Sequence, residues 1–455
     1  MSWFLRTKAL PITKVAATIA IVAVAALGAT ASAGAATPTT GCFWIGPYDR
    51  DAFDDPELNV AYPDEGAAYW AARFNMPAGS RLILEGRFPH ARYMSLNAYS
   101  AGAPTDTLTD VAVEPRRDSV NPFAPGARRD LGRSRREFRI EVVDAPAPGA
   151  GQPREPNTLY AESPGGVQEL MYRVYVPDKG RASAGGVGVP KPELVLADGT
   201  RLEGRAACEA INDPVRELPS QRIPVSLYTA LVNTPGADFE TVPAFAPVRW
   251  EAFFNFTYAL SVYKVGTPSE PDRELIDTTP SGGQYSNGDA RYVIGPINKT
   301  YGDLLVLRGK MPTFPSTRGG ARRMRDGQVR YWSMCQNESP VTTSVVDCVY
   351  DEQVPLTGKR RYTIVVGNAS NRPDNANRDC GVKFLHWGHY VDPLGRANVG
   401  TLLMRNMRAD PGFDEAIQNV DEPGREAAVM GPYLPRSEYV SERDFAALGC
   451  AQAAH

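Results

Sequence analysis

Residues 302–312, GDLLVLRGKMP, and residues 79–89, GSRLILEGRFP, are two versions of one sequence pattern. When both are extended toward the N-terminus without gaps, residues 69–89 align with residues 292–312. The identical positions include a tyrosine, two glycines and the final proline. Self-similarity of this kind is identified before any other feature, because each copy folds as one structural module. The sequence therefore predicts an internal duplication.

The similarity continues through both copies as short segments in the same order. Matched positions along these segments are Arg92-Tyr93 with Arg330-Tyr331, Asp110 with Asp347, Glu114 with Asp351, and Arg173 with Arg405. Apolar and polar residues alternate in the segments, and Gly or Pro ends them, as is typical of antiparallel strands. We therefore expect a mainly β fold with two tandem homologous β-sandwich (jelly-roll-like) units, long loops and a few short helices.

The expected domain plan divides the chain into six parts. These are a signal peptide (1–35), a mature N-terminal segment (36–68), repeat one (69–181), a linker, hairpin and inter-repeat segment (182–291), repeat two (292–411) and a C-terminal helical segment (412–455). Within the segment 182–291, residues 193–204 are predicted to form a hairpin around an Asp-Gly turn. Residues 249–262 are predicted to form a helix, with a strand as the alternative. Short helices are expected at 413–420 and 441–448, the latter begun by Ser441.

The N-terminus carries the pattern of an export signal. Arg6, Lys8 and Lys14 flank an apolar run at residues 15–27, which is shorter than the roughly 20 residues of a membrane span. We expect cleavage, no transmembrane segment, and a secreted, extracellular or cell-envelope location. Cys42 has the look of a lipoprotein cysteine, but no leucine stands at position 39, which favours a disulfide there.

The six cysteines are an even number in a chain expected to be exported, so they predict disulfides rather than a metal site. Cys335 and Cys348 lie in consecutive predicted strands, which makes a bridge across that hairpin the leading pair. For the remaining four we expect Cys42 with Cys208 and Cys380 with Cys450, among the fifteen pairings that six thiols allow.

Charge and motifs exclude several function classes. The net charge is −3, and loss of the signal would make it about −6, which does not suit nucleic-acid binding. The sequence has no Gly-x-Ser-x-Gly elbow, no His-Glu-x-x-His and no phosphate-binding glycine loop opening a helix. We therefore expect no cofactor, no metal and no nucleotide chemistry, and the oligomeric state is left open.

The repeated arginines are the leading site candidates. An arginine in an otherwise apolar strand needs a partner, because burying an unpaired guanidinium is costly. One interpretation pairs them with the repeated acids within each sandwich. The other places them in a cleft between the repeats, where they bind an anionic ligand. The candidate ligand-binding residues are Arg92, Tyr93, Arg173, Arg330, Tyr331 and Arg405.

Two arginine-rich loops add to the second interpretation. One holds Arg116, Arg117, Arg128, Arg129, Arg133, Arg135 and Arg136, and the other Arg318, Arg322, Arg323 and Arg325. In an acidic protein such clusters create local positive fields, which suit a polyanionic cell-envelope polymer or lipid headgroups as partners. The alternative is that both loops are simply solvated.

The histidines carry the competing enzyme hypothesis. His90 lies in the turn before the Arg92 strand, while His386 and His389 are three residues apart and face opposite sides of a strand unless Gly388 bends it. The two function hypotheses are therefore a non-catalytic envelope or ligand-binding protein, and an extracellular hydrolase with His90 or His386 beside a carboxylate in the inter-repeat cleft.

Four segments resemble uncharacterised secreted proteins common in actinobacteria. They are residues 92–96 (RYMSL), 121–123 (NPF), 330–337 (RYWSMCQN) and 430–435 (MGPYLP). The resemblance implies export and the repeat, and it implies no activity.

Overall fold

The computed structural model describes residues 42–149, 151–163, 166–211, 222–233, 237–264 and 277–454. The predicted signal peptide, the first residues of the N-terminal segment and His455 lie outside this range. The described residues belong to one compact unit of the chain. They form a mainly β structure with four sheets and short helices, as the sequence predicts.

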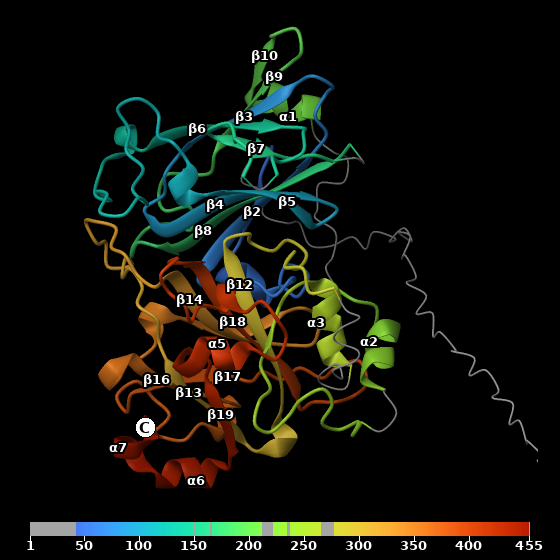
Figure 1. Cartoon of the computed structure of the whole chain (residues 1–455), viewed down its shortest axis with the longest axis vertical. Coiled ribbons are helices and arrows are strands. Elements are labelled where there is room, and N and C mark those ends of the chain that lie inside the picture. Colours follow the sequence, from blue (N-terminus) through green and yellow to red (C-terminus); the bar gives the residue numbers. More distant parts are fainter. Residues whose placement is uncertain are drawn as a thin grey trace, which may run out of the picture. The chain divides into compact units, whose positions relative to one another are not determined.

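The first sandwich has two five-stranded sheets (Figure 1). Its inner sheet has the order β1 (Ile45–Tyr48), β2 (Ala67–Phe74), β8 (Gln168–Pro177), β4 (Ala91–Ser100) and β5 (Ala103–Thr109). Its outer sheet has the order β10 (Arg201–Glu203), β9 (Lys191–Val195), β3 (Arg81–Arg87), β6 (Glu137–Val143) and β7 (Thr158–Tyr160). Trp70, Leu84, Phe138 and Tyr172 from both sheets are buried together in the core between them.

The second sandwich repeats this plan. Its inner sheet has the order β11 (Glu251–Ala252), β12 (Ala290–Asn298), β18 (Val399–Ala409), β14 (Val329–Asn337) and β15 (Val345–Tyr350). Its outer sheet has the order β17 (Val382–His386), β16 (Arg361–Gly367), β13 (Leu304–Lys310) and β19 (Arg436–Val440). The edge pairs β6–β7 and β16–β17 are both parallel, whereas the other strand pairs are antiparallel. The two inner sheets have the same strand order, and in the outer sheets β19, β13, β16 and β17 take the places of β9, β3, β6 and β7. Two tandem sandwiches of this kind are the expected architecture.

A shared glycine explains part of the repeated sequence pattern. A Cβ atom on Gly86 would lie 2.3 Å from Cζ of Phe138, and one on Gly309 would lie 2.6 Å from the hydroxyl oxygen of Tyr362. Both rings belong to the neighbouring strand of the outer sheet, opposite the glycine. The same close ring-to-backbone contact therefore excludes a side chain at the same place in both sandwiches.

The connecting segments depart from the sequence prediction in two places. The hairpin around Asp198 is present, but β9 pairs with β3, so it extends the first outer sheet and does not stand between the sandwiches. The predicted helix at 249–262 is a short strand followed by α3 (Phe256–Tyr263). Asn255 begins this helix, because its side-chain oxygen accepts the backbone N–H of Tyr258.

The C-terminal segment is not wholly helical, since it also supplies β19. At 413–420 only Ile417–Asn419 forms a single 3-10 turn. Ser441 begins a helix as predicted, with its Oγ accepting the backbone N–H of Asp444. The remaining helices are α1 (Gly204–Ile211), α2 (Val225–Val232), α5 (Glu426–Met430), α6 (Glu442–Ala447) and α7 (Gly449–Ala453). Further 3-10 turns lie at Arg50–Asp54, Asp110–Ala112, Arg133–Arg135, Lys299–Tyr301, Asp351–Gln353, Gly358–Arg360, Ala369–Asn371 and Gly431–Tyr433.

All three predicted disulfides are present: Cys42–Cys208, Cys335–Cys348 and Cys380–Cys450. Disulfides persist in oxidising compartments, so the three bridges are consistent with an extracellular protein. The disulfide interpretation of Cys42 is therefore confirmed. In the described part of the chain, no helix combines the length and the apolar character that crossing a bilayer requires.

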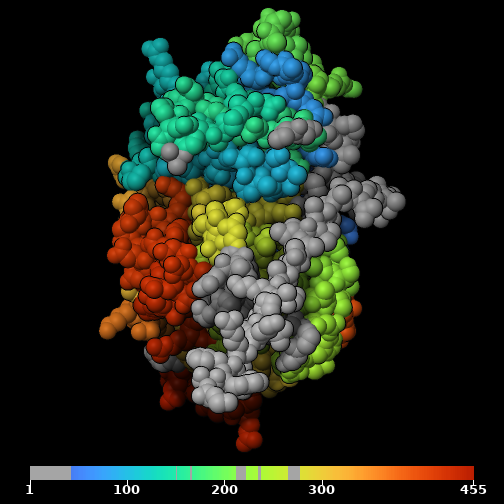
Figure 2. Space-filling model, turned by 45° about the vertical axis from the view of Figure 1, so that its right-hand side comes forward, coloured from blue at the N-terminus to red at the C-terminus, as the bar shows by residue number. Residues whose placement is uncertain are grey.

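The inner sheets of the two sandwiches meet. Tyr93 and Tyr175 from the first pack with Tyr331 and Met407 from the second in one buried cluster. Figure 2 shows the surface of the first sandwich, blue to green, directly against that of the second, yellow to red. This contact explains why β4 and β14 are buried along both faces although each contains arginine, serine and asparagine.

Candidate ligand-binding site

The six arginines and tyrosines predicted to bind a ligand lie in the interface between the sandwiches, and they have protein partners there. Arg92 is fully buried, and its Nη1 donates to Oδ1 of Asp351 at 2.5 Å while Nη2 contacts Glu352. Arg330 makes the reciprocal contact, with Nη1 3.1 Å from Oδ2 of Asp110. Each arginine thus pairs with an acid of the other sandwich, not of its own.

The reciprocal pairs correct the alignment of the repeated acids. Asp110 and Asp351 each begin the 3-10 turn that follows the fifth strand of an inner sheet, so they are the equivalent positions. Burial raises the pKa of both carboxyl groups, and the facing arginines oppose that shift. Contacts that recur with the partners exchanged are the mark of an isologous, approximately two-fold interface.

Arg173 and Arg405 also cross the interface. The Nη2 of Arg405 donates to the carbonyl oxygen of Tyr62 at 2.6 Å, and Arg173 donates to the carbonyl oxygen of Tyr285. Both acceptor residues have positive φ, 51° and 50° respectively. The same unusual backbone turn therefore presents a carbonyl to an arginine from the opposite sandwich, twice.

Tyr93 and Tyr331 complete the set. The hydroxyl of Tyr93 donates to Oδ2 of Asp289 at 2.6 Å, and that of Tyr331 donates to Oδ1 of Asp64 at 2.6 Å. All six side chains are thus buried at the junction and bonded to protein groups. Their arrangement holds the sandwiches together, and it leaves them facing protein instead of an open cleft.

The two arginine-rich loops bind each other. The backbone N–H of Arg129 donates to the carbonyl of Arg322 at 2.9 Å, and that of Gly126 donates to the carbonyl of Met324 at 2.9 Å. Arg128 and Arg322 both form ion pairs with Asp130. The two loops are therefore held to each other, and Asp130 neutralises part of their positive charge.

His90 does not line either pocket described below. Its backbone N–H donates to the carbonyl of Gly185 at 3.1 Å, and its ring is half-buried beside arginines. Burial, with Arg136, Arg181 and Arg129 adding to it, lowers the pKa of His90 to about 4. In the described residues its ring has no carboxylate or hydroxyl partner, so the acid/base pair expected of a hydrolase is not formed.

His386 lies at the end of β17 and lines a pocket. Its backbone N–H, not its ring, donates to Oδ2 of Asp347 at 2.9 Å. The ring is exposed and packs edge-on against Phe384, with the ring centres 5.5 Å apart. His389 is exposed beyond Gly388, whose φ is +84°. No carboxylate or hydroxyl partner of either imidazole is found in the part of the chain that the structure describes.

One group of potential metal ligands is found among the described residues, Asp64 with Cys335 and Cys348. Both sulfurs belong to the same disulfide, and a thiolate is the form of cysteine that binds a metal. The geometry is that of a disulfide next to a buried acid.

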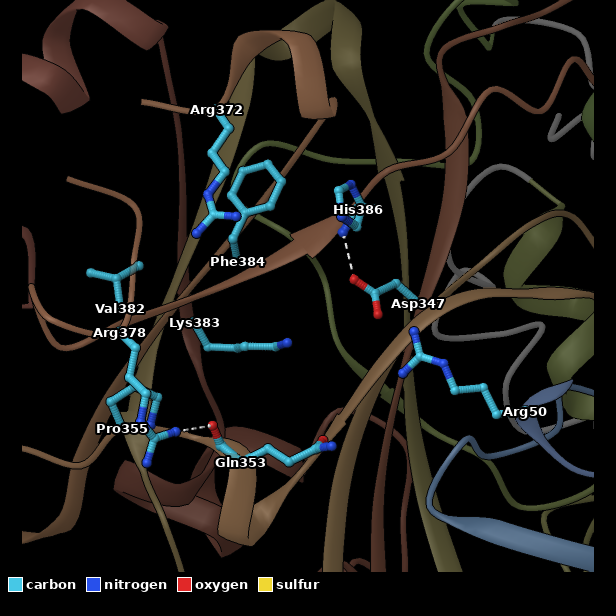
Figure 3. A pocket seen from close by; sticks show the side chains of 10 residues that line it. All are labelled: Arg50, Asp347, Gln353, Pro355, Arg372, Arg378, Val382, Lys383, Phe384 and His386. Atoms are coloured by element: carbon cyan, nitrogen blue, oxygen red, sulfur yellow. Dashed lines mark hydrogen bonds between the residues drawn. The ribbon is translucent and has the colours of Figure 1, made fainter. Parts of the chain in front are cut away.

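The pocket that His386 lines has a volume of ≈ 350 Å³ (Figure 3). It is formed by the 3-10 turn Arg50–Asp54, the end of β15, the turn after it, a loop closed by Cys380–Cys450, and the edge strand β17. Its lining residues are Arg50, Asp347, Gln353, Pro355, Arg372, Arg378, Val382, Lys383, Phe384 and His386. Cationic side chains from three separate segments therefore surround it.

Two of these cations are held by neutral acceptors. Nη1 of Arg378 donates to the carbonyl of Gln353 at 3.0 Å, and Nε of Arg372 donates to the carbonyl of Ala376 at 2.9 Å. The guanidinium of Arg372 also lies 5.0 Å from the centre of the Phe384 ring. A carbonyl or a ring fixes the position of a guanidinium without cancelling its charge, so both remain available to an anion.

Lys383 and Arg50 complete the positive lining. Figure 3 shows both side chains pointing into the space below the Asp347 carboxylate. No ion pair of Lys383 is found within the described residues, whereas Arg50 pairs with Glu65 at 2.9 Å. Burial and the neighbouring Asp347 raise the pKa of Glu65 to about 7, against the pull of Arg50 and Lys383. Near neutral pH Glu65 is thus only partly charged.

Sequence reasoning singled out His386 and the repeated acid Asp347 among these lining residues, but none of the cations. Arg50, Arg372, Arg378 and Lys383 lie in loops or at a sheet edge, where cations are common. The one local signal was Lys383 in the otherwise apolar stretch 382–385, VKFL. A lysine on an edge strand is also a usual device against edge-to-edge association, so this signal alone does not indicate a site.

No family model matches the chain, and no curated protein matches it. Among solved structures it is similar to an uncharacterized protein from Burkholderia cenocepacia, at 12% identity over 84% of this chain and 79% of that chain, with a TM-score of 0.43. A second likeness is to the VPA0106 protein from Vibrio parahaemolyticus, at 11% identity over 83% of this chain and 89% of that one, with a TM-score of 0.36. Both are too distant to carry an argument about function.

Proposed function

We propose that this protein is an exported binding protein for a small anionic ligand, held by a carboxylate or phosphate group in the pocket between Arg50 and β17. The observation that carries the proposal is the lining of a ≈ 350 Å³ pocket by Arg50, Arg372, Arg378 and Lys383, with Asp347 as the one acid among its lining residues. The volume lies within the range of small-molecule sites, about 300–1,000 Å³.

The positions of these cations favour binding over solvation. Arg372 and Arg378 belong to the loop that the Cys380–Cys450 bridge ties to the C-terminal helices. Their guanidinium groups are already oriented by backbone carbonyls, so an anion would order few additional side chains on binding. Guanidinium groups recognise carboxylate and phosphate through paired, charge-assisted hydrogen bonds.

Export forms part of the same proposal. The three disulfides support export. The signal peptide at residues 1–35 and the resemblance to secreted actinobacterial proteins are sequence-based predictions that agree with it. The earlier expectation of an envelope polymer or lipid is narrowed here to an anionic group small enough for the pocket.

The alternative of an extracellular hydrolase ranks second. In its favour, His386 lines the pocket beside Asp347. Against it, the bond between these residues comes from the backbone of His386, so no acid orients the imidazole. General base catalysis needs a ring nitrogen within hydrogen-bond reach of the proton that it takes.

Isothermal titration calorimetry of the protein at low ionic strength, with inorganic phosphate and with acetate as probes, tests the proposal. Lys383→Gln should weaken binding about tenfold or more, because a charge-assisted hydrogen bond contributes about 1.5–3 kcal/mol. Arg117→Gln is the matched control, since it also removes one positive charge, from an exposed residue that does not line the pocket. Equal loss in both variants, or no binding by the wild type, would overturn the proposal.

A further inference from the structure

A second pocket adjoins the first. It has a volume of ≈ 400 Å³ and is lined by Lys179, Arg318, Gly319, Tyr350, Glu352, Gln353 and Arg378. Gln353 and Arg378 line both pockets, so the two spaces lie on either side of one arginine. Three of the lining residues of the second pocket are cations.

The acid in the second pocket is already engaged. Glu352 pairs with the buried Arg92 and accepts the backbone N–H groups of Thr317 at 2.8 Å and Arg318 at 3.1 Å. Although burial opposes it, the charge of Arg92 with these donors lowers the pKa of Glu352. Glu352 is therefore held as a carboxylate whose charge serves Arg92. Lys179, Arg318 and Arg378 have no ion pair with any described residue.

Both sandwiches contribute to this second pocket. Lys179 follows β8 of the first, and Arg318 lies in the loop between β13 and β14 of the second. The backbone N–H of Lys179 donates to the carbonyl of Arg318 at 2.7 Å, which holds the two cations next to each other. In the first sandwich only three residues separate β3, which ends at Arg87, from β4, which begins at Ala91. The loop between β13 and β14 of the second sandwich is much longer, and it carries Arg318 to the junction. The first sandwich has no loop of this length between β3 and β4.

We infer that the ligand carries two anionic groups joined by a short spacer, one group bound by Lys383 and its neighbours and the other by Lys179 and Arg318, with Arg378 between them. The inference rests on the proposed function, since it adds a second subsite to the first. Joining two groups makes the second binding step intramolecular, so a dianion gains affinity without any new kind of contact.

Titration calorimetry with paired probes tests the inference. The probes are linear α,ω-dicarboxylates of four to eight carbons against the monocarboxylates of equal length, and α,ω-bisphosphates against monophosphates. For the wild type we expect the best dianion to bind at least tenfold more tightly than its monoanion. The preferred series, carboxylate or phosphate, identifies the anionic group, and the preferred length reports the separation of the subsites.

Variants separate the two pockets. In the double variant Lys179→Gln/Arg318→Gln the ratio of dianion to monoanion affinity should fall toward one, whereas Lys383→Gln should weaken both anions. Arg117→Gln should leave the ratio as in the wild type. Circular dichroism verifies that each variant is folded, which is expected because Lys179 and Arg318 are exposed.

Each outcome decides between the two claims. A wild-type ratio near one, or a ratio that the double variant does not change, overturns the two-group ligand and leaves the proposed function standing. A ratio that falls equally in Arg117→Gln shows a general charge effect and also overturns it. Absence of binding for every anion overturns the proposed function together with the inference.

Discussion

The two sandwiches differ at equivalent corners, where the fifth strand of each inner sheet meets the edge strand of the outer sheet. At the first corner Oδ2 of Asp106 accepts the backbone N–H of Tyr160 at 2.9 Å, and at the second Oδ2 of Asp347 accepts that of His386 at 2.9 Å. The first corner also holds Arg154, which pairs with Asp106 and lies 5.1 Å from the Tyr160 ring centre.

The second corner has no such closure. None of the described residues forms an ion pair with Asp347 within 4 Å, and Arg378 donates to a carbonyl instead. Both copies therefore keep the bond that anchors the edge strand, while only one of them fills the space beside it with its own arginine. The comparison teaches that the two sandwiches share their interface contacts and differ at this corner, where the second leaves the space that the proposed function assigns to an anion.

The largest effect on stability is expected from removing the reciprocal arginine–aspartate pairs that both sandwiches contribute to the interface. Arg92→Met leaves Asp351 buried without its ion-pair partner, whereas Arg330→Met removes one of the two cations that pair with Asp110 and leaves Arg408 in place. We expect Arg92→Met to lower the free energy of unfolding by about 3–5 kcal/mol, and Arg330→Met by less. Denaturant titration measures both, with Arg117→Met as the control. A loss below about 1 kcal/mol for Arg92→Met would contradict the assigned role.

The contacts of Arg92 could be predicted from the sequence only in part. The repeated residues and the alternating strands predict two tandem sandwiches, and the even cysteine count predicts disulfides. Only Cys335–Cys348 follows from the strand positions, whereas the other two pairs were chosen among open alternatives. The repeats do not predict that Arg92 reaches the opposite sandwich, because a strand pattern reports which face is apolar and not what covers the other face.

The pocket could not be predicted from the sequence for a related reason. Its cations come from residues 50, 372–378 and 383, and nothing local to any one of them indicates that folding brings them together. The interface arginines were visible because they are repeated. Arg372, Arg378 and Lys383 belong to the second copy and Arg50 follows β1 of the first, and none of them has a repeated counterpart that would mark it in the sequence.

The next largest effect is expected when two residues of the second sandwich are replaced by their counterparts in the first. Cys335 and Cys348 pair across β14 and β15 where Asn97 and Thr107 pair across β4 and β5, and Asn97 Nδ2 donates to Thr107 Oγ1 at 2.8 Å. Replacing the disulfide by Cys335→Asn/Cys348→Thr should lower the free energy of unfolding by about 3 kcal/mol, as expected for a short closed loop.

The double alanine variant at the same positions is its control. Arg405 donates to the sulfur of Cys335 at 2.9 Å, while the equivalent Arg173 donates to Oδ1 of Asn97 at 2.5 Å. The asparagine variant should therefore be more stable than the alanine variant by denaturant titration. Equal stabilities would show that the two positions are not equivalent.

The stability of the protein should depend on pH through Glu65, which pairs with Arg50 beside the second corner. Burial raises the pKa of Glu65 to about 7 from its usual value of 4.5, so between these values the folded state holds more protons than the unfolded state. Stability therefore falls as pH rises through this window. Relative to Glu65→Gln, the wild type should lose about 2 kcal/mol between pH 5 and pH 7 by denaturant titration. A constant difference between the two proteins across that range would refute the shift.

The smallest effect compares the two corner arginines directly. Arg154→Met removes the partner of the buried Asp106, and we expect it to lower the free energy of unfolding by about 1 kcal/mol. Arg378→Met removes no carboxylate contact, so its loss should stay below about 0.5 kcal/mol while anion binding weakens. The reverse order of stabilities would mean that the second corner is closed like the first.

The reciprocal arginine pairs make the two halves of the chain depend on each other. Each half supplies the counter-charge that the other half requires, so a chain cut between α1 and α2 would yield two pieces that each carry an uncompensated set of arginines and acids. The stability of each half therefore depends on the presence of the other, and a single sandwich of this sequence is not expected to fold alone.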